Sequence, residues 1–246
     1  MQDVLVTTAD GSNTLFSTKY QQHHHNTEDG AIAESLNKHV IPALSFHKNS
    51  LELNILDICF GLGYNTLATI YYCLKENLNI KLNFYSVELD IDLIKSLEDF
   101  VYPKEFESLK DIILQISQNQ KYQDENIKIE VFLGDARQFI GKLPKDFFDI
   151  VYQDAFSSEV NYELWTKEYF DDIYNICKNN VILTTYAIAT PIRLSMHEAK
   201  FLIYESRPTK RKITLAFKNK QDLLGKFIDM ELKQSRNTQA KALYDN

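Results

Sequence analysis

The stretch of residues 53–65 constrains the fold more than any other part of this sequence. An apolar strand pattern at 53–58 is followed by a turn with Gly61 and Gly63, and then by a helical pattern. A strand that turns tightly into a helix is the building unit of open α/β sheets, whose ligands bind at the carboxyl ends of the strands. Glycine allows the positive φ and the close backbone approach that such a turn needs. The stretch therefore predicts an α/β protein with a ligand above this turn.

A Gly-x-Gly turn after a strand is about as often a plain packing turn as part of a nucleotide-binding site, so a second signal is needed. Residues 83–90 supply it, because this apolar run also ends in a carboxylate, Glu88. Glu88 follows Gly63 by about 25 residues, close to the spacing at which an acid at the end of the second strand binds ribose hydroxyls. The sequence thus predicts a ligand that contains a ribose.

Strand and helix patterns alternate from residue 51 onward. Apolar runs predict three further strands, at 128–133, 147–152 and 181–186. Helical patterns lie at 65–75, 91–119, 162–177 and 190–199, the second with a break at Pro103. This alternation is typical of a doubly wound, mostly parallel sheet. Runs at 201–205 and 212–217 predict a closing hairpin, which makes the last strand antiparallel.

The same patterns divide the chain into 1–50, 51–218 and 219–246. We expect residues 1–50 to form an N-terminal β-hairpin extension around Asp10 and Gly11, followed by a helix at 31–47. The histidines at 23–25 are expected in a polar loop, in which one of them can line a site, since adjacent residues do not converge on one metal ion. Residues 51–218 hold the α/β domain, and the polar residues 219–246 are expected to form a loosely packed tail.

Composition excludes several classes of protein. A hydrophobic content of 44% is enough for a core and argues against wholesale disorder. No apolar run approaches the roughly 18–20 residues that span a bilayer, and the first 25 residues lack the layout of a signal peptide. Cys59, Cys73 and Cys177 are scattered and odd in number, which argues against a disulfide framework or a cysteine zinc site. We therefore expect a soluble, cytoplasmic protein with no membrane partner.

Carboxylates end four consecutive strands of the expected sheet, namely Asp57, Glu88, Asp135 and Asp154. Parallel strands share one direction, so these side chains are expected along one edge. A single aspartate there is commonly an Asx turn or a helix N-cap, but four in register favour a ligand site. A dinucleotide brings two phosphates to this acidic edge, whereas S-adenosylmethionine brings no phosphate and a positive sulfonium. The site therefore favours S-adenosylmethionine over NAD.

Three of the four acids and the two turn glycines are each expected to contact a particular part of S-adenosylmethionine. Glu88 is expected at the ribose diol, Asp135 at the adenine amino group and Asp57 near the methionine end. Gly61 and Gly63 let the cofactor lie flat against the turn, because neither residue carries a Cβ.

Three segments together resemble the methyltransferase domain of the MnmC family, bifunctional enzymes of the tRNA wobble uridine. They are residues 57–65, residues 134–136 and the element Asp154-Ala155-Phe156-Ser157 with Asn161, Leu164 and Trp165. Further matches lie at residues 30–35, at 184–186, at Arg193 and at 210–216. The resemblance spans roughly residues 7 to 218, and its third element is fairly specific.

The resemblance implies a Rossmann-like fold and S-adenosylmethionine as the cofactor. It implies methylation of the 5-aminomethyl group of (2-thio)uridine at tRNA position 34, with the anticodon region of tRNA as partner. Residues 219–246 are too few for the FAD-dependent oxidase domain of the bifunctional members, so methyltransferase activity alone is expected. The residues that match cofactor-binding positions are Asp57, Gly61, Gly63, Asn65, Glu88, Asp135, Ala136 and Asp154.

The sequence departs from the family pattern at three positions. Cys59 replaces the first glycine of the usual Gly-Phe-Gly-x-Gly turn, and since it carries a Cβ the turn is expected to begin after it. Ser158 and Tyr162 stand where the family usually has prolines, so the substrate loop is expected to be less rigid than in the family.

Asp154 is the candidate catalytic residue. Methyl transfer to an amine needs the neutral amine aligned with the S–CH₃ bond, and most of the acceleration is expected from proximity and orientation. Asp154 is expected to accept an amine hydrogen bond and can receive the released proton. Phe156 and Trp165 are expected to flank or stack on an extruded uridine, with core packing as the alternative for both.

The net charge of −7 argues against a broad nucleic-acid surface, which needs many cations. A local basic patch remains compatible with it, because the field near a site depends on how charge is distributed. The candidates for binding tRNA phosphates are Arg193, Lys210 and Arg211, together with Arg207 and Lys212. A solvated surface without a partner is the alternative for such a charge run.

Two other functions stay open. A spermidine-synthase-like aminopropyltransferase shares the fold, the acidic strand ends and a polar N-terminal β-extension, although the 161–165 and 210–211 matches count against it. A non-catalytic module that binds a nucleoside or a partner protein is the second alternative. The four acids and both turn glycines argue against that module. The oligomeric state is not determined by the sequence.

Overall fold

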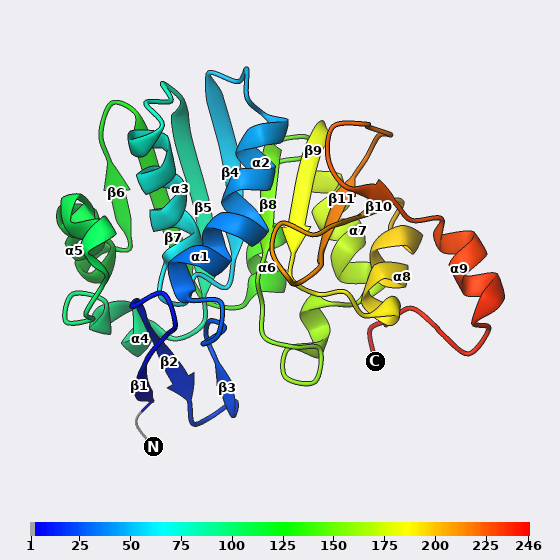
Figure 1. The fold of residues 1–246 in the computed structure, drawn as a ribbon, viewed down its shortest axis with the longest axis horizontal. Coiled ribbons are helices and arrows are strands. Elements are labelled where there is room, and N and C mark those ends of the chain that lie inside the picture. The colour runs from blue at the N-terminus through cyan, green and yellow to red at the C-terminus, as the bar shows by residue number, and fades with distance from the viewer. Residues whose placement is uncertain (1–2) are drawn as a thin grey trace.

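The computed structural model describes residues 3–246. Over these residues, nine strands form one mixed sheet in the order β12-β10-β11-β9-β8-β4-β5-β7-β6 (Figure 1). Its parallel strands are β4 (Glu52–Ile58), β5 (Lys81–Glu88), β7 (Ile127–Leu133), β8 (Phe148–Gln153) and β9 (Cys177–Thr185). The antiparallel end consists of β11 (Ile213–Phe217), β10 (Leu202–Ser206) and β12 (Lys226–Phe227). The predicted doubly wound, mostly parallel sheet with an antiparallel last strand is confirmed.

Strand β4 lies between β5 and β8. The chain moves outward from β4 through β5 to β7, and then returns to β8 on the opposite side of β4. Because the strand order reverses at this point, the carboxyl ends of β4 and β8 leave a crevice, which is where ligands of such sheets bind.

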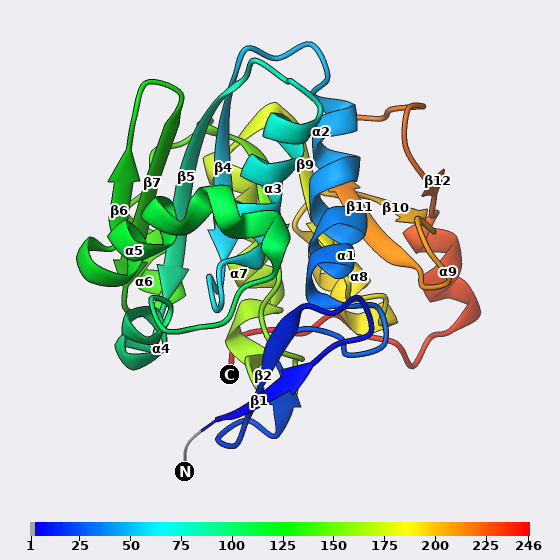
Figure 2. The same ribbon diagram turned by 60° about the vertical axis from the view of Figure 1, so that its left-hand side comes forward.

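Helices cover both faces of the sheet, and each face has its own core (Figures 1 and 2). One face carries the 31–46 helix, α3 (Tyr64–Lys75) and α5 (Lys110–Asn119). The other carries α6 (Ala136–Ile140), α7 (Lys167–Ile176) and α8 (Thr190–Glu198). Successive side chains of a strand point to opposite faces of the sheet, so each strand contributes to both cores. Ile55 and Leu56 of β4, for example, belong to opposite cores. None of the helices in residues 3–246 has the length and apolarity to cross a membrane.

The N-terminal extension lies beyond the carboxyl ends of the central strands (Figure 1). It is an antiparallel sheet of β1 (Val4–Thr7), β2 (Asn13–Ser17) and β3 (Gln22–His23). The predicted hairpin is confirmed, because β1 and β2 pair on either side of Asp10 and Gly11, and Gly11 has a φ of 81°. Tyr64 of α3 donates its hydroxyl to the Asn13 carbonyl at 2.7 Å and so ties the extension to the domain.

Residues 31–46 are helical, as their spacing predicts, but the middle turn is widened. A π-helical segment, η1 (Leu36–Val40), separates α1 (Ala31–Ser35) from α2 (Ile41–Phe46). Pro42 has no N–H to donate, and it follows directly after the widened turn, where the hydrogen-bond pattern of the helix already changes. Lys38, His39 and Val40 of η1 are all buried, so this segment brings two polar side chains into the interior.

Two parts of the sheet differ from the predictions. An edge strand that was not predicted, β6 (Lys121–Gln123), pairs antiparallel with β7. Strand β9 begins at Cys177 and not at 181, because a register irregularity lets the polar residues 178–180 continue the strand beyond the buried part. The helical region 91–119 divides at Pro103 as expected, into α4 (Ile91–Ser96), a 3-10 segment η2 (Lys104–Leu109) and α5.

Residues 219–246 contain the edge strand β12, which was not predicted, and the helix α9 (Met230–Arg236). Most of these residues are exposed, while Met230 and Ala242 are buried against the domain. The Leu243 carbonyl accepts the N–H of Lys167 at 2.7 Å. The segment is therefore anchored at a few points, and its loose packing stays a prediction.

Candidate active site

A cavity of about 1180 Å³ opens at the carboxyl ends of β4, β5, β7 and β8. The N-terminal extension forms the opposite wall, and Figures 1 and 2 show it next to these strand ends. His24 lines the cavity from the extension, and Glu88 and Asp154 line it from the strand ends. The predicted ligand edge and the N-terminal segment thus enclose one site.

The turn between β4 and α3 begins earlier than expected. Cys59 has a φ of 64°, Gly61 of 55° and Gly63 of 72°. The expectation that the turn begins after Cys59 is therefore wrong, because Cys59 itself takes the left-handed region, which costs a residue with a Cβ roughly 1–2 kcal/mol. At Gly63 a Cβ would come within 2.7 Å of the Phe60 ring. Glycine is thus required at Gly63, and the turn keeps its shape around Cys59 at the expense of some strain.

Glu88, at the end of β5, holds this turn in place. Its Oε2 accepts the N–H of Gly61 at 2.9 Å, and its Oε1 accepts the N–H groups of Leu89 and Asp90 at 2.8 and 2.9 Å. Burial raises the pKa of Glu88, although these N–H groups act in the opposite direction. Oε2 accepts only one of these N–H groups and keeps a further lone pair, so Glu88 can also accept a hydroxyl group of a ribose.

Asp57 is completely buried between β4 and α3. Its Oδ2 accepts the hydroxyl of Thr66 at 2.8 Å, whereas its Oδ1 has no hydrogen-bond partner in the described part of the chain. Burial raises the pKa of Asp57 to about 8, and the nearby carboxylates of Asp154 and Glu88 add to the rise. A positive ligand group near Asp57 would favour the charged form and offset this penalty.

Asp154 follows β8 and is held from two sides. Asn65 Nδ2 donates to its Oδ2 at 2.9 Å, and His39 Nε2 lies 3.5 Å from its Oδ1. Burial acts to raise the pKa of this carboxyl, but His39, with smaller contributions from His25 and Asn65, lowers it well below its usual range. Asp154 is therefore an anion at neutral pH, and its side chain lines the cavity.

Three aromatic rings border the cavity beside the loop that follows β8. The Phe156 ring centroid lies 5.2 Å from those of Tyr20 and His24, which belong to the N-terminal extension. Gln22 Nε2 donates to Ser157 Oγ at 2.7 Å and fixes the extension to the same loop. Burial lowers the pKa of His24 to about 4, so its ring is neutral at pH 7. These rings offer apolar faces to a planar ligand.

Trp165 does not line the cavity, so the prediction that it stacks on a substrate base is wrong. Its ring is completely buried and packs edge-on against Tyr186, with the centroids 6.0 Å apart. Its Nε1 donates to the Phe156 carbonyl at 2.8 Å, while Asn161 Oδ1 accepts the N–H of Phe156 at 3.1 Å. Core packing is the correct alternative for Trp165, which supports the substrate loop from inside.

Asp135 and Ala136 lie on the rim of the cavity, after β7. Asp135 is the N-cap of α6, and its Oδ1 accepts the N–H of Gln138 at 2.9 Å. The helix-cap alternative therefore holds for one of its oxygens. Gly134 joins this rim to β5, because its N–H donates to the Glu88 carbonyl at 2.9 Å. The adenine-binding role of Asp135 stays a prediction.

Arg193 does not belong to the predicted phosphate-binding patch. Its side chain is buried, Nε donates to Thr214 Oγ1 at 2.9 Å, and Nη1 donates to Glu205 Oε2 at 3.1 Å. These contacts join α8 to the closing hairpin, so the phosphate-binding prediction for Arg193 is corrected to a structural role. The sequence could not place it, since both partners lie on strands that follow α8.

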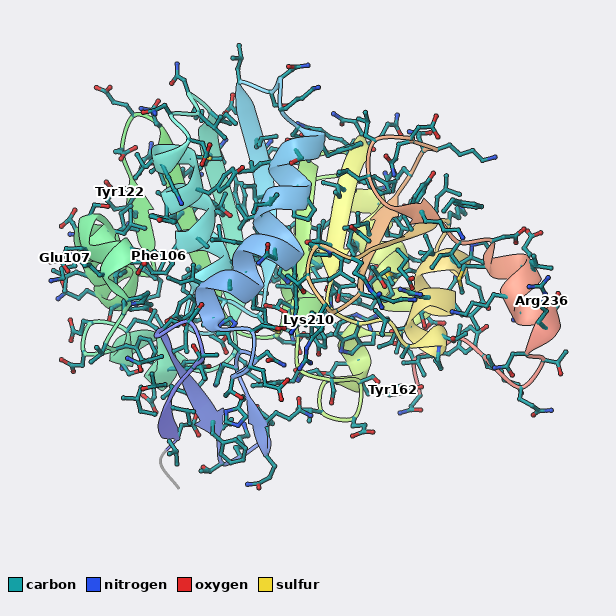
Figure 3. All side chains as sticks on the ribbon, viewed as in Figure 1. Phe106, Glu107, Tyr122, Tyr162, Lys210 and Arg236 are labelled. Carbon is teal, nitrogen blue, oxygen red and sulfur yellow. The ribbon has the colours of Figure 1, made fainter. Side chains whose placement is uncertain are left out.

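Lys210 and Arg211 lie on the surface, in the loop between β10 and β11. Figure 3 shows Lys210 near the middle of the molecule and Arg236 of α9 at its right-hand side. Arg211 lines the cavity and donates to Glu28 Oε2 at 2.6 Å, so an acidic neighbour balances part of its charge. Lys210 is exposed. Their binding to phosphates stays a prediction.

Local sequence patterns do not indicate His39, Tyr20 or the particular role of His24. No motif marks His39, and its one signal is a polar residue beside the apolar Val40 in a helical pattern. The histidines at 23–25 form a polar segment as expected, and all three line the cavity.

The side chains of the cavity fit S-adenosyl-L-methionine. Asn65 lines the cavity, and its buried Oδ1 has no hydrogen-bond partner in residues 3–246, so it is free to accept a donor of the ligand such as an ammonium group. Asp57 lies behind the lining, and its unpaired Oδ1 adds negative charge near the site. Glu88 Oε2 can accept a ribose hydroxyl, and the absence of a Cβ at Gly61 leaves room above the turn. The predicted cofactor therefore agrees with the chemistry of the site.

Comparison with known proteins supports this conclusion. Residues 103–219 match a family described as S-adenosyl-L-methionine-dependent methyltransferase. The uncharacterized protein MJ0670 of Methanocaldococcus jannaschii is 31% identical over 223 residues, which are 89% of this chain and 60% of that protein. The tRNA 5-methylaminomethyl-2-thiouridine biosynthesis bifunctional protein MnmC of Leptospira borgpetersenii is 28% identical over 163 residues, which are 63% of this chain and 24% of that protein. The chain spans less than two thirds of the length of these relatives.

Solved structures give the same result. The crystal structure of MnmC2 from Aquifex aeolicus aligns with a TM-score of 0.82 and 28% identity, over 95% of this chain and 75% of that chain. A probable spermidine synthase from Corynebacterium glutamicum aligns with a TM-score of 0.61 and 12% identity, over 99% of this chain and 93% of that chain, so that likeness concerns the fold alone. The predicted resemblance to the MnmC methyltransferase domain is confirmed by these relatives, and residues 103–219 match the S-adenosyl-L-methionine-dependent methyltransferase family.

Proposed function

We propose that this protein methylates the 5-aminomethyl group of (2-thio)uridine at the wobble position of tRNA, giving 5-methylaminomethyl-(2-thio)uridine. The observation that carries the proposal is the anionic Asp154, held at the cavity by Asn65 and near His39, beside an aromatic wall. An acidic acceptor next to flat rings suits a substrate that combines a primary amine with a planar base. The names of the MnmC relatives agree with this substrate.

When bound, S-adenosyl-L-methionine supplies a methyl group on a sulfonium, which passes to a neutral amine nitrogen with release of one proton. Asp154 accepts a hydrogen bond from the amine and aims the nitrogen lone pair toward the cofactor side of the cavity. Its charge also stabilises the positive charge that grows on the nitrogen. Because the pKa of Asp154 is lowered, this carboxylate orients and stabilises, and it is a weak final acceptor for the proton.

Phe156 and the two rings of the N-terminal extension, Tyr20 and His24, are the proposed stacking surface for the extruded base. Stacking on aromatic side chains is the usual way in which proteins hold an unpaired RNA base. Lys210 and Arg211 are the proposed contacts to the phosphates of the anticodon region. The cytoplasmic location expected from the sequence stays a prediction.

An aminopropyltransferase is the second candidate function. The acidic cavity favours it, because a polyamine substrate is positively charged and Glu88, Asp135 and Asp154 all line the cavity. The likeness to a probable spermidine synthase extends over nearly the whole chain but concerns the fold. We rank it second because the MnmC-type segments include the loop that carries Asp154 and Phe156.

The test is transfer of labelled methyl from S-adenosyl-L-methionine to tRNA from cells that lack this protein, followed by mass analysis of the nucleosides. We expect 5-methylaminomethyl nucleosides with the wild-type protein and none with Asp154→Ala. An anticodon stem-loop with the 5-aminomethyl group is the minimal substrate, and the same stem-loop without it is the matched control.

The competing function is tested in parallel with decarboxylated S-adenosylmethionine and putrescine. Formation of spermidine without any labelling of tRNA would replace the proposed function with the second candidate. Cofactor binding without either reaction would instead indicate a non-catalytic module.

A further inference from the structure

We propose that His39 is a positioning residue for Asp154: it presents Nε2–H to the carboxylate and holds it in one orientation toward the cavity. The inference rests on the proposed function insofar as Asp154 acts on the substrate amine. The arrangement of the two side chains can be tested without that function.

His39 has two neighbours that fix its ring. Its Nδ1 lies 2.7 Å from Thr184 Oγ1 of β9, and its Nε2 lies 3.5 Å from Asp154 Oδ1. The ring is completely buried and packs edge-on against Tyr152, with the centroids 5.5 Å apart. The Thr184 hydroxyl can donate to Nδ1, and this leaves the ring proton on Nε2, facing the carboxylate.

The Nε2 atom has no hydrogen bond in residues 3–246. A buried imidazole nitrogen without a partner is unusual, since buried polar atoms are nearly always paired. The nearest acceptor is the Asp154 carboxylate, at a distance that is long for a hydrogen bond. Catalytic hydrogen bonds are often long in the free enzyme and shorten when the substrate binds. We therefore expect this contact to tighten as the substrate amine engages Asp154.

The π-helical segment η1 explains how a helix residue reaches this place. Three consecutive residues, Lys38, His39 and Val40, are buried there, and the segment packs against α3 and β9. Single π-helical turns are frequently found at functional sites. Lys38 pairs with Glu34 on the same helix, so of the two buried polar side chains only His39 faces Asp154.

Asn65 and His39 contact different oxygens of the Asp154 carboxylate. Asn65 Nδ2 donates to Oδ2 at 2.9 Å, and His39 Nε2 faces Oδ1. Two donors on different oxygens fix the plane of a carboxylate, and the remaining lone pairs are then aimed at the ligand. Rate depends steeply on such alignment, because a displacement of about 1 Å can cost a factor of 100.

The kinetic test compares His39→Phe with His39→Gln. We expect His39→Phe to lower kcat for methyl transfer by at least about tenfold, with KM for tRNA and Kd for S-adenosyl-L-methionine within about twofold of wild type. His39→Gln keeps an N–H donor at a similar reach and is expected to recover most of kcat. A wild-type kcat in His39→Phe, or equal losses in both variants, would overturn the inference.

His47 provides the matched control, because it is also a buried histidine of the same helical region and its Nε2 lies 3.0 Å from the backbone carbonyl of Asp149. His47→Phe is expected to lower thermal stability and to leave kcat unchanged. A similar loss of kcat in both phenylalanine variants would show that the effect of His39→Phe is only structural.

The spectroscopic test needs no turnover. The ¹⁵N shifts of the His39 ring in the wild-type protein at pH 7 are expected to show a proton on Nε2, and Asp154→Asn is expected to move the Nε2 shift more than the Nδ1 shift. A proton on Nδ1 alone would overturn the inference. If the wild-type protein does not methylate tRNA but these shifts are as expected, the proposed function fails while the placement of His39 stands.

Discussion

The carboxyl ends of β4 and β8 lie side by side, and each carries one aspartate: Asp57 is completely buried, whereas the side chain of Asp154 is 17% exposed. Asp57 at β4 accepts the hydroxyl of Thr66 on one oxygen, its other oxygen has no hydrogen-bond partner in residues 3–246, and its pKa is raised to about 8. Asp154 after β8 has Asn65 and a nearby histidine, and its pKa is lowered. Burial acts in the same direction on both groups, so the difference comes from their partners.

This contrast indicates different roles for Asp57 and Asp154. Asp154 is charged before any ligand arrives and is ready to orient an amine. Asp57 becomes charged at neutral pH only when a cation offsets its burial, which suits the positively charged end of a cofactor. Neighbouring strand ends of one sheet thus provide an acceptor that is always ionised and one that depends on the ligand.

The largest expected effect comes from neutralising each aspartate in turn. Asp154→Asn is expected to lower kcat for methyl transfer by about 10²–10⁴, because charge is lost where positive charge develops. Asp57→Asn is expected to raise KM for S-adenosyl-L-methionine and to change kcat by less than about tenfold. Steady-state rates of labelled methyl transfer measure both, and a larger loss of kcat in Asp57→Asn would reverse the assignment.

The next effect is on stability and its dependence on pH. The folded protein keeps a proton on Asp57 up to about pH 8, whereas the unfolded chain loses it near pH 4. The stability that this group contributes is therefore fully present below about pH 4 and is lost as pH rises toward 8. Asp57→Asn stays neutral, so it should remove this decline and be more stable than wild type by about 1–3 kcal/mol at pH 8.

Urea unfolding from pH 5 to pH 9 measures this difference. Asp154→Asn is the internal comparison, because a lowered pKa gives stability that is present above the unfolded pKa and is lost as pH falls. Parallel pH curves for Asp57→Asn and wild type would contradict the raised pKa of Asp57.

A smaller effect is expected from removing the donors. Asn65→Leu deprives Asp154 of its 2.9 Å hydrogen bond and is expected to lower kcat about tenfold, in line with the loss of a bond to a charged group. Thr66→Val deprives Asp57 of its donor, and we expect a further rise in the Asp57 pKa with kcat within about twofold. Equal losses of kcat in the two variants would show that the two strand ends are not distinct.

The smallest effect concerns the turn that connects these regions. Cys59→Gly removes the left-handed strain at a φ of 64° and is expected to stabilise the protein by about 0.5–1 kcal/mol without changing kcat. Cys73→Gly is the matched control, because Cys73 lies inside α3 and glycine destabilises a helix interior. Thermal denaturation of both variants should give shifts of opposite sign, and a loss of stability in Cys59→Gly would contradict the strain.

Much of the site could be predicted from local patterns. The glycine turn and the loop at 154–157 are each contiguous in sequence, and each acid lies at the end of an apolar strand pattern. Parallel strands then bring these carboxyl ends to one edge. The errors have a common cause. Trp165 is in the core and Arg193 is paired with Glu205, since their surroundings come from segments that are distant in the chain. Neither burial nor pairing of a side chain follows from its neighbours in sequence.

The sequence by itself determined the order of strands and helices, the turn at Gly61 and Gly63, and the acidic edge that selects the cofactor. Short-range periodicity and spacing encode these features. Only the tertiary structure decided which aspartate is charged, because the donors on Asp154 come from α3 and from a helix more than 100 residues earlier in the chain. A carboxyl group's charge depends on the atoms around it, and folding alone brings those atoms together.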